Sequence, residues 1–209
     1  TVVPLGEADR VDEIARMLAG DTIWSFSPEK VLAVRNDWAE NEPALTGRLL
    51  RAVWRASRWL GTGGVSTTAA EMLSRPEYLN LSSEIIDRAL SGHLVISSDG
   101  ESREVPGFLE FWDGAATFPW KSQAAWIAEQ MAGRLGLDRA QARSAAAQVF
   151  RSDLFRQHLR EAGAVLPGAS EKLEGGIARG TRAGAEVGRL DLAENRFFDG
   201  RVFDPLGTT

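Results

Sequence analysis

The chain has 209 residues, of which 44% are hydrophobic, and its formal net charge at pH 7 is −5. This length and composition suffice for one large domain or two small ones, and the negative charge disfavours general or direct binding to nucleic acid. The absence of cysteine excludes disulfides, thiolate metal ligands and cysteine nucleophiles. No apolar run approaches the roughly 20 residues of a membrane span, so membrane insertion is not expected. The first residues also lack the basic start and apolar stretch of a signal peptide.

The first third of the chain alternates helical and β-type patterns. Apolar spacing predicts a short amphipathic helix over residues 11–18, and two short β-type runs, 22–26 and 30–34, flank a Ser-Pro turn. Strands this short usually belong to a sheet whose other members lie elsewhere in the sequence. The strongest helical pattern covers residues 42–60, with Asn41 as its expected cap, a proline in its first turn and Gly61 just past its end.

The middle of the chain is mainly helical. Capping residues and apolar periodicity predict helices over 67–74, 83–91, 123–135, 139–150 and 153–159, and a strand over 94–97. Glycines and single charges then alternate without periodicity over residues 166–190, which predicts a long mobile loop. Phe197 to Phe203 is expected to form a hairpin around a type I′ Asp-Gly turn.

This pattern predicts a helix-rich α/β fold in three parts. Residues 1–165 form the helix-rich α/β portion and residues 166–190 the mobile, glycine-rich loop. Residues 191–209 form a C-terminal hairpin and tail that pack back on the same domain. No arrangement of nucleophile, base or paired carboxylates points to catalysis. His93 and His158 lack companions at metal-ligand spacing, so neither a metal nor a cofactor is expected.

Three aromatic-rich motifs stand out, at residues 24–30 (WSFSPEK), 118–122 (FPWKS) and 196–205 (RFFDGRVFDP). Their order and spacing resemble the nitrate and bicarbonate substrate-binding family of ABC transporters. The arginine- and tryptophan-rich helix 48–59 and the segment 166–172 favour the nitrate-sensor branch of that family. The resemblance implies a two-lobed fold of the type II periplasmic-binding-protein kind. The chain would be its C-terminal portion, because family members are much longer.

The resemblance also implies a function, which is to bind nitrate or nitrite without catalysing a reaction. Transport members of the family supply an ABC permease, whereas sensor members control an RNA-binding antiterminator protein. A cytoplasmic sensor is the expectation here, with a periplasmic transport component as the alternative. A second alternative is a ligand-free helical protein-interaction module derived from the same family.

Three residues are the candidate ligand-binding groups. Lys30 comes first, because a small anion in a closed cleft needs a cation or several N–H donors, and the resemblance implies that a lysine near this motif contacts nitrate. The alternative is a surface lysine paired with Glu29 or another carboxylate. Trp24 either walls the ligand pocket or belongs to the core. Lys121 precedes an expected helix cap at Ser122, so it marks either an anion site at a helix N-terminus or an ordinary surface lysine.

The candidate partner-binding face is a stripe of arginines on the helix 42–60. Arg48, Arg51, Arg55 and Arg58 recur at helical spacing. The alternative is an ordinary solvated helix face.

Overall fold

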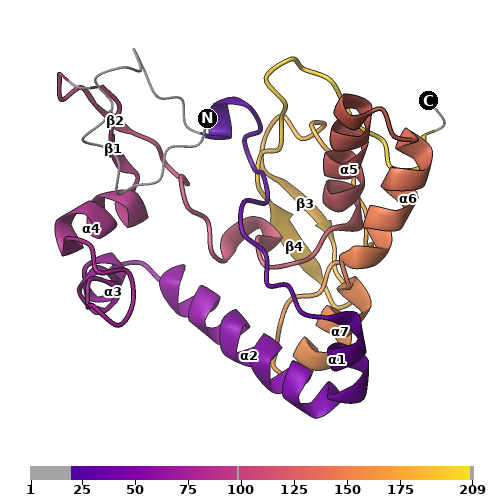
Figure 1. The fold of residues 1–209 in the computed structure, drawn as a ribbon, viewed down its shortest axis with the longest axis horizontal. Coiled ribbons are helices and arrows are strands. Elements are labelled where there is room, and N and C mark those ends of the chain that lie inside the picture. Colours follow the sequence, from indigo (N-terminus) through magenta and orange to yellow (C-terminus); the bar gives the residue numbers. More distant parts are fainter. Residues whose placement is uncertain (1–19, 98, 208–209) are drawn as a thin grey trace.

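The computed structural model describes residues 20–97 and 99–207, and helices predominate in it (Figure 1). The helix expected over residues 11–18 lies outside the described residues. The α-helices are α1 (Asn36–Asn41), α2 (Pro43–Leu60), α3 (Ser66–Leu73), α4 (Ser83–Ser91), α5 (Lys121–Leu135), α6 (Arg139–Val149) and α7 (Ser152–Leu159). The strands are β1 (His93–Val95), β2 (Ser102–Glu104), β3 (Thr181–Gly184) and β4 (Arg189–Leu192), and the 3-10 turns are η2 (Gly20–Thr22) and η3 (Asp113–Ala115).

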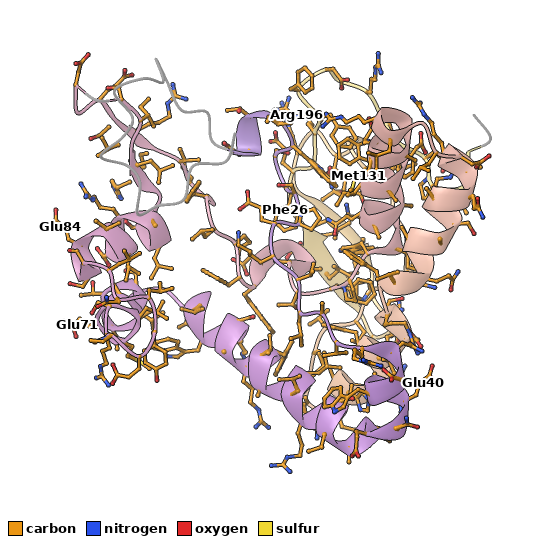
Figure 2. The ribbon with its side chains drawn as sticks, viewed as in Figure 1. Phe26, Glu40, Glu71, Glu84, Met131 and Arg196 are labelled. Carbon is orange, nitrogen blue, oxygen red and sulfur yellow. The ribbon has the colours of Figure 1, made fainter. Side chains whose placement is uncertain are left out.

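Figure 1 shows two groups of elements joined by α2. The smaller group contains α3, α4, β1 and β2, and its helices pack on each other. The larger group contains α1, α5, α6, α7, β3 and β4, with α5 packed along α6 and α2 packed on α7. Figure 2 adds the side chains, with Glu71 and Glu84 on the smaller group and Met131 on α5. At 1.5 Å per residue, α2 is about 27 Å long, and this length separates the two groups that it connects.

The helix boundaries follow the end signals of the sequence. Pro43 opens α2, where its missing N–H costs no hydrogen bond, and Gly61 ends that helix as predicted. Asp138 caps α6, and its carboxylate accepts the N–H of Gln141 at 2.7 Å. Gly136 ends α5 in the left-handed conformation at φ +67°, which glycine adopts without strain.

The core of the larger group is aromatic and leucine-rich. Phe118 lies between Trp120 and Phe155, with ring centroids 4.8 and 5.3 Å apart, and both pairs meet edge to face. Leu190 and Leu192 of β4 alternate with exposed residues and face this cluster. The whole cluster consists of Trp54, Phe118, Trp120, Phe155, Leu159, Leu166, Leu190 and Leu192.

Both sheets in the described ranges are antiparallel and two-stranded, β1 with β2 and β3 with β4. A two-stranded sheet is only marginally stable by itself, so each sheet depends on packing against helices or loops. The β-type run at 30–34 forms no strand, which corrects the sequence prediction. Of the run at 22–26, only Trp24 takes part in a ladder, through a bridge to Phe197.

The structure also differs from the sequence prediction after residue 165. The segment 166–190, expected to be an irregular mobile loop, contains β3 and three bridges: Pro167 to Ala185, Glu174 to Phe203 and Ile177 to Asn195. The hairpin expected at 197–203 does not form, because its two ends pair with different segments. Phe197 bridges Trp24, and Phe203 bridges Glu174. Only the turn is retained, with the N–H of Gly200 bonded to the carbonyl of Phe197.

The contact between α2 and α7 depends on a glycine. A Cβ added to Gly47 would lie 2.6 Å from Nδ1 of His158, so a larger residue would force the imidazole ring out of this position. Nη1 of Arg51 donates to the carbonyl of His158 at 3.5 Å, and Nε2 of that histidine is buried without a hydrogen-bond partner in the described structure. Burial and the nearby charge of Arg51 lower the pKa of His158 below its ordinary value of 6.5.

Stability should therefore fall in mild acid. Between the lowered folded pKa of His158 and its unfolded value near 6.5, the unfolded chain binds more protons than the folded chain, so the free energy of unfolding decreases as the pH falls. We expect His158→Gln to reduce the loss of melting temperature between about pH 7 and about pH 5. Thermal unfolding followed by circular dichroism measures this. His93→Gln is the matched control, since His93 is exposed on β1, and an equal effect of both substitutions would contradict the assignment.

Candidate functional site

A cavity of about 800 Å³ lies between α2 and segments that border the larger group of elements. Its walls are the segment 24–36, the inner side of α2, the segment 107–119 and the start of α7. The lining is mostly apolar, and Phe26 lies on the first of these segments (Figure 2). Among the described lining residues, only Lys30 and Arg151 are cationic.

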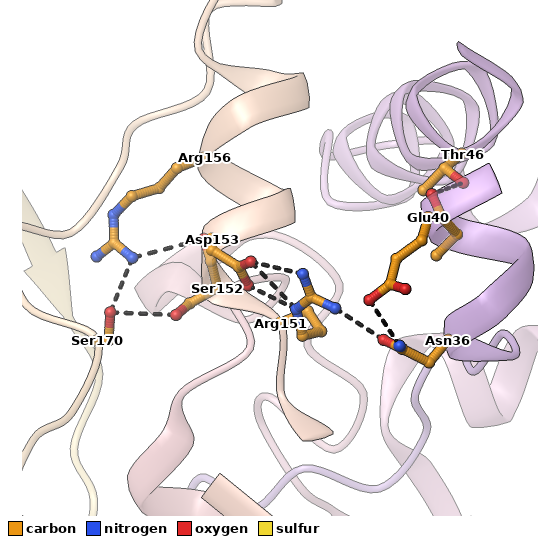
Figure 3. A network of polar contacts seen from close by, with 9 residues as sticks. Asn36, Glu40, Thr46, Arg151, Ser152, Asp153, Arg156 and Ser170 are labelled. Atoms are coloured by element: carbon orange, nitrogen blue, oxygen red, sulfur yellow. Dashed lines mark hydrogen bonds and ion pairs between the residues drawn. The ribbon is translucent and has the colours of Figure 1, made fainter. Parts of the chain in front are cut away.

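Arg151 is fully engaged by neighbouring polar groups (Figure 3). Its Nε and Nη2 atoms donate to the carboxylate of Asp153 at 2.7 to 3.1 Å, and Nη1 donates to the side-chain oxygen of Asn36 at 2.9 Å. The guanidinium holds the pKa of the Asp153 carboxyl below its ordinary value, and that carboxylate in turn raises the pKa of Arg151. Arg151 thus positions the end of the segment 24–36, and its charge is already compensated.

Lys30 is different, because it lines the same cavity and is exposed. No hydrogen bond or ion pair involves its side chain in the part of the chain that the structure describes, and the expected alternative of a pair with Glu29 is absent there. Ser27 and Thr117 also line the cavity and can supply hydroxyl groups. Within the described residues the cavity therefore offers one uncompensated cation, and hydroxyl groups also line it, which suits a small anion.

Trp24 borders the cavity but belongs mainly to the core. Only 4% of it is exposed, and its ring packs against those of Trp126 and Phe197, with centroids 4.8 and 5.1 Å away; these two rings stack on each other at 4.6 Å. Its Nε1–H donates to Oδ1 of Asn195 at 2.8 Å. The indole N–H is thus already used within the protein, and Trp24 can offer an anion no hydrogen bond from this group.

The bond from Trp24 leads into a buried polar network centred on Glu174, whose side chain is fully buried. One carboxylate oxygen of Glu174 accepts the hydroxyl of Ser122 at 2.6 Å. The other accepts the amide of Asn195 at 2.7 Å and the ammonium of Lys172. Oδ1 of Asn195 also accepts the N–H of Gly175 at 2.9 Å. The buried carboxylate is therefore paired and hydrogen-bonded, as a charge in this position must be.

Lys172 is nearly as buried as its partner, with 10% of its side chain exposed. Its ammonium also lies 5.5 Å from the ring centroid of Trp120. Burial lowers the pKa of Lys172 below its ordinary value, although Glu174 acts in the opposite direction. The pair is structural, since neither side chain lines the cavity.

The predicted anion site at Lys121 takes another form in the structure. Lys121 is the first residue of α5, its backbone N–H donates to the carbonyl of Ser170, and its side chain does not line the cavity with Lys30 and Trp24. Ser122, the expected cap, instead bonds to the carboxylate of Glu174. The anion beside the first turn of α5 is thus one of the protein's own side chains. Sequence reasoning missed it, because Glu174 lies in a glycine-rich stretch without periodicity.

The arginine stripe of α2 divides into two pairs. Arg51 bonds to α7, and the guanidinium of Arg58 lies 5.9 and 5.7 Å from the rings of Trp54 and Trp112. Arg48 and Arg55 are exposed, and neither has a charged or hydrogen-bonded partner within residues 20–97 and 99–207. At 3.6 residues per turn, these two arginines lie on the side of α2 away from the cavity-lining Val53. Two of the four predicted partner-binding arginines, Arg51 and Arg58, therefore make contacts within the fold.

Two further features are absent from the described residues. No group of three or more His, Asp or Glu side chains there is placed to hold a metal ion. No helix in those ranges has the length and apolar character needed to cross a membrane.

Comparisons with known proteins agree with the motifs. The model of the NMT1-like family matches residues 14–74. The nitrate/nitrite binding protein NrtA of Synechococcus elongatus is 29% identical over 187 residues, which cover 88% of this chain and 38% of that protein. The bicarbonate-binding protein CmpA of the same organism is 25% identical over 193 residues, which cover 88% and 39%.

Over most of its length the chain is similar to binding proteins of the nitrate and bicarbonate substrate-binding family. Its fold is similar to the crystal structure of the periplasmic nitrate-binding protein NrtA from Synechocystis, with a TM-score of 0.71 at 24% identity. That match covers 88% of this chain and 44% of the solved one. The predicted helix-rich α/β fold, as part of a two-lobed binding protein, is confirmed. The chain spans less than half the length of these relatives, and its proposed closeness to the sensor branch stays a prediction.

The buried network predicts a large effect of one substitution. We expect Glu174→Gln to lower the free energy of unfolding by about 3 kcal/mol or more, because it leaves the buried ammonium of Lys172 without its counter-charge. Urea denaturation followed by tryptophan fluorescence measures this. Glu194→Gln, which removes a partly exposed carboxylate, is the control and should cost less than about 1 kcal/mol.

A second variant checks the cause of that loss. Adding Lys172→Met to Glu174→Gln should restore most of the stability, since an apolar side chain in place of the unpaired cation removes the desolvation cost. A double variant no more stable than Glu174→Gln alone would show that the carboxylate stabilises the fold through some other contact.

Proposed function

We propose that this chain forms part of a protein that binds a small oxyanion, nitrate or nitrite in preference to bicarbonate, without chemical change. The observation that carries the proposal is the position of Lys30, an uncompensated cation at the cavity. The names of the relatives support the ligand class, since they are a nitrate/nitrite binding protein and a bicarbonate-binding protein.

The binding step needs the closure of a cleft. An exposed lysine gains little from an anion in water, whereas the same pair in a closed, water-poor cleft is bound much more strongly. The ligand therefore favours the closed form and shifts the population towards it. The segment 24–36 and α2 both line the cavity, and they are parts that such a movement could bring together.

We propose the role of a substrate-binding component of an ABC importer, with the nitrate sensor as the alternative. The solved relative is described as periplasmic, which favours a periplasmic location over the cytoplasmic one expected from the sensor resemblance. Arg48 and Arg55 are the candidate contacts for a partner protein, because they are exposed and unpaired in the described structure. The antiterminator partner rests on the sensor resemblance alone.

A titration tests the anion site. We expect nitrate or nitrite to change the tryptophan fluorescence of the chain in a saturable way, at constant ionic strength with chloride as the background anion. Lys30→Ala should weaken this binding by about tenfold to a hundredfold, the loss of one charge-assisted contact.

Arg48→Ala is the matched control, because it removes a cation from the opposite side of α2 and leaves the cavity intact. Its affinity should equal that of the parent chain. Equal responses of the parent and Lys30→Ala, or no response to nitrate, nitrite or bicarbonate, would rule out an anion site at Lys30.

A further inference from the structure

A second polar side chain reaches the cavity from α5. Gln123 is the third residue of that helix, it lines the cavity, and only 5% of it is exposed. Its side-chain amide makes no hydrogen bond to any other residue in the ranges 20–97 and 99–207. A carboxamide carries two N–H donors and an oxygen acceptor, and burying these groups without partners is costly. An unpartnered amide at a cavity therefore indicates a hydrogen-bonding occupant there.

The other buried polar groups at the cavity are already used. Of the described lining residues that are buried, Trp24, Thr46 and Gln123 have polar side-chain atoms. The indole of Trp24 donates to Asn195, and the hydroxyl of Thr46 donates to the carbonyl of Ala39 at 3.5 Å. Within this part of the chain, Gln123 is thus the buried polar side chain that remains available to a ligand.

The packing of α5 places Gln123 close to the segment that carries Lys30. Trp126 follows Gln123 by three residues, so the two side chains lie on one side of the helix. The ring of Trp126 contacts that of Trp24, with centroids 4.8 Å apart, and Trp24 begins the cavity-lining segment 24–36. The cavity therefore has an exposed ammonium on one wall and a buried amide on another.

An anion in this cavity needs more than the charge of Lys30. Asp21, Glu29 and Glu110 also line the cavity, and their carboxylates oppose the approach of an anion. A small anion also needs several hydrogen-bond donors when it leaves water. The amide of Gln123 can donate without adding charge, so it supplies what the lysine alone does not.

The buried carboxylate near the start of α5 does not prevent this. Glu174 accepts the hydroxyl of Ser122, the residue before Gln123. Its charge is compensated by the ammonium of Lys172, with which it forms an ion pair. The pair is neutral as a whole, so its repulsion of an anion at the Gln123 amide is weak.

We propose that Gln123 is a second ligand group of the anion site and donates its side-chain N–H to one oxygen of nitrate or nitrite, while Lys30 compensates the charge of the ion. The inference rests on the proposed function, since it concerns the same site. Both ions carry more than one oxygen acceptor, so a lysine and an amide can bind one ion together. The amide recognises an oxygen acceptor, and the ammonium recognises the negative charge.

One substitution tests this role. Gln123→Met keeps a side chain of similar length and removes its hydrogen-bonding groups. We expect it to weaken nitrate binding about tenfold in the fluorescence titration, the loss of one hydrogen bond to a charged ligand. Gln130→Met is the matched control, because Gln130 is an exposed residue of the same helix that does not line the cavity. Its affinity should equal that of the parent chain.

Thermal unfolding separates ligand binding from a structural role. Without nitrate, Gln123→Met should melt at the same temperature as the parent or higher, because the buried amide has no protein partner to lose. Saturating nitrate should raise the melting temperature of the parent and of Gln130→Met. At the same nitrate concentration, the increase for Gln123→Met should be smaller, since its affinity is lower.

Every other result overturns the proposal. A lower melting temperature of Gln123→Met without nitrate would show that the amide stabilises the fold. Equal nitrate affinities of Gln123→Met and the parent, with weaker binding by Lys30→Ala, would exclude Gln123 as a ligand group and leave the proposed function intact. A parent chain that responds to no anion would overturn both.

Discussion

The fold depends on one buried carboxylate. Glu174 connects residues that lie far apart in the sequence, since its network reaches Ser122 in α5, Asn195 after β4, and Trp24 near the start of the described chain. A charge without access to water must be satisfied by several partners at once, so these segments cannot shift independently. Gly175 reinforces the arrangement, because its φ of +81° and its close approach to Phe197 both favour glycine.

The same constraint determines where the candidate site lies. The network fixes Trp24, and the bond from Arg151 fixes Asn36, so the segment between them is held across the cavity. Residues 28–34 of this segment make no backbone hydrogen bond with the other described residues. Lys30 lies in the middle of this segment, beside the exposed Val31 and Leu32. The candidate cation therefore directly precedes a run whose backbone groups are unpaired in the described structure, and a strand that paired with this run would also change the surroundings of the cation.

The sequence predicted elements whose signals are local and missed those whose partners are distant. The bounds of α2 and α6 follow from Pro43, Gly61 and Asp138, each acting within one turn of its helix. The order in residues 166–190 depends instead on bridges to residues 195 and 203 and on burial of Glu174, which periodicity within the segment cannot reveal. The run at 30–34 has a strand pattern, but no partner strand lies beside it in the described structure. The predicted strand is therefore absent there. For the site, sequence reasoning placed Lys30 and Trp24 at one cavity but could not tell that the indole N–H was already bonded.

The motifs that indicate the family are largely structural in this chain. Trp24, Ser122 and Phe197 each come from a different motif, and each packs or bonds around the buried network and its aromatic neighbours. Selection for stability alone would retain them, because loss of any one leaves a cavity or an unsatisfied polar group. A relative that had lost anion binding would therefore keep the same motifs apart from Lys30, whose ammonium contributes no contact to the described fold. Similarity across the motifs is thus evidence for the fold, and the evidence for anion binding is the free charge of that single lysine at the cavity.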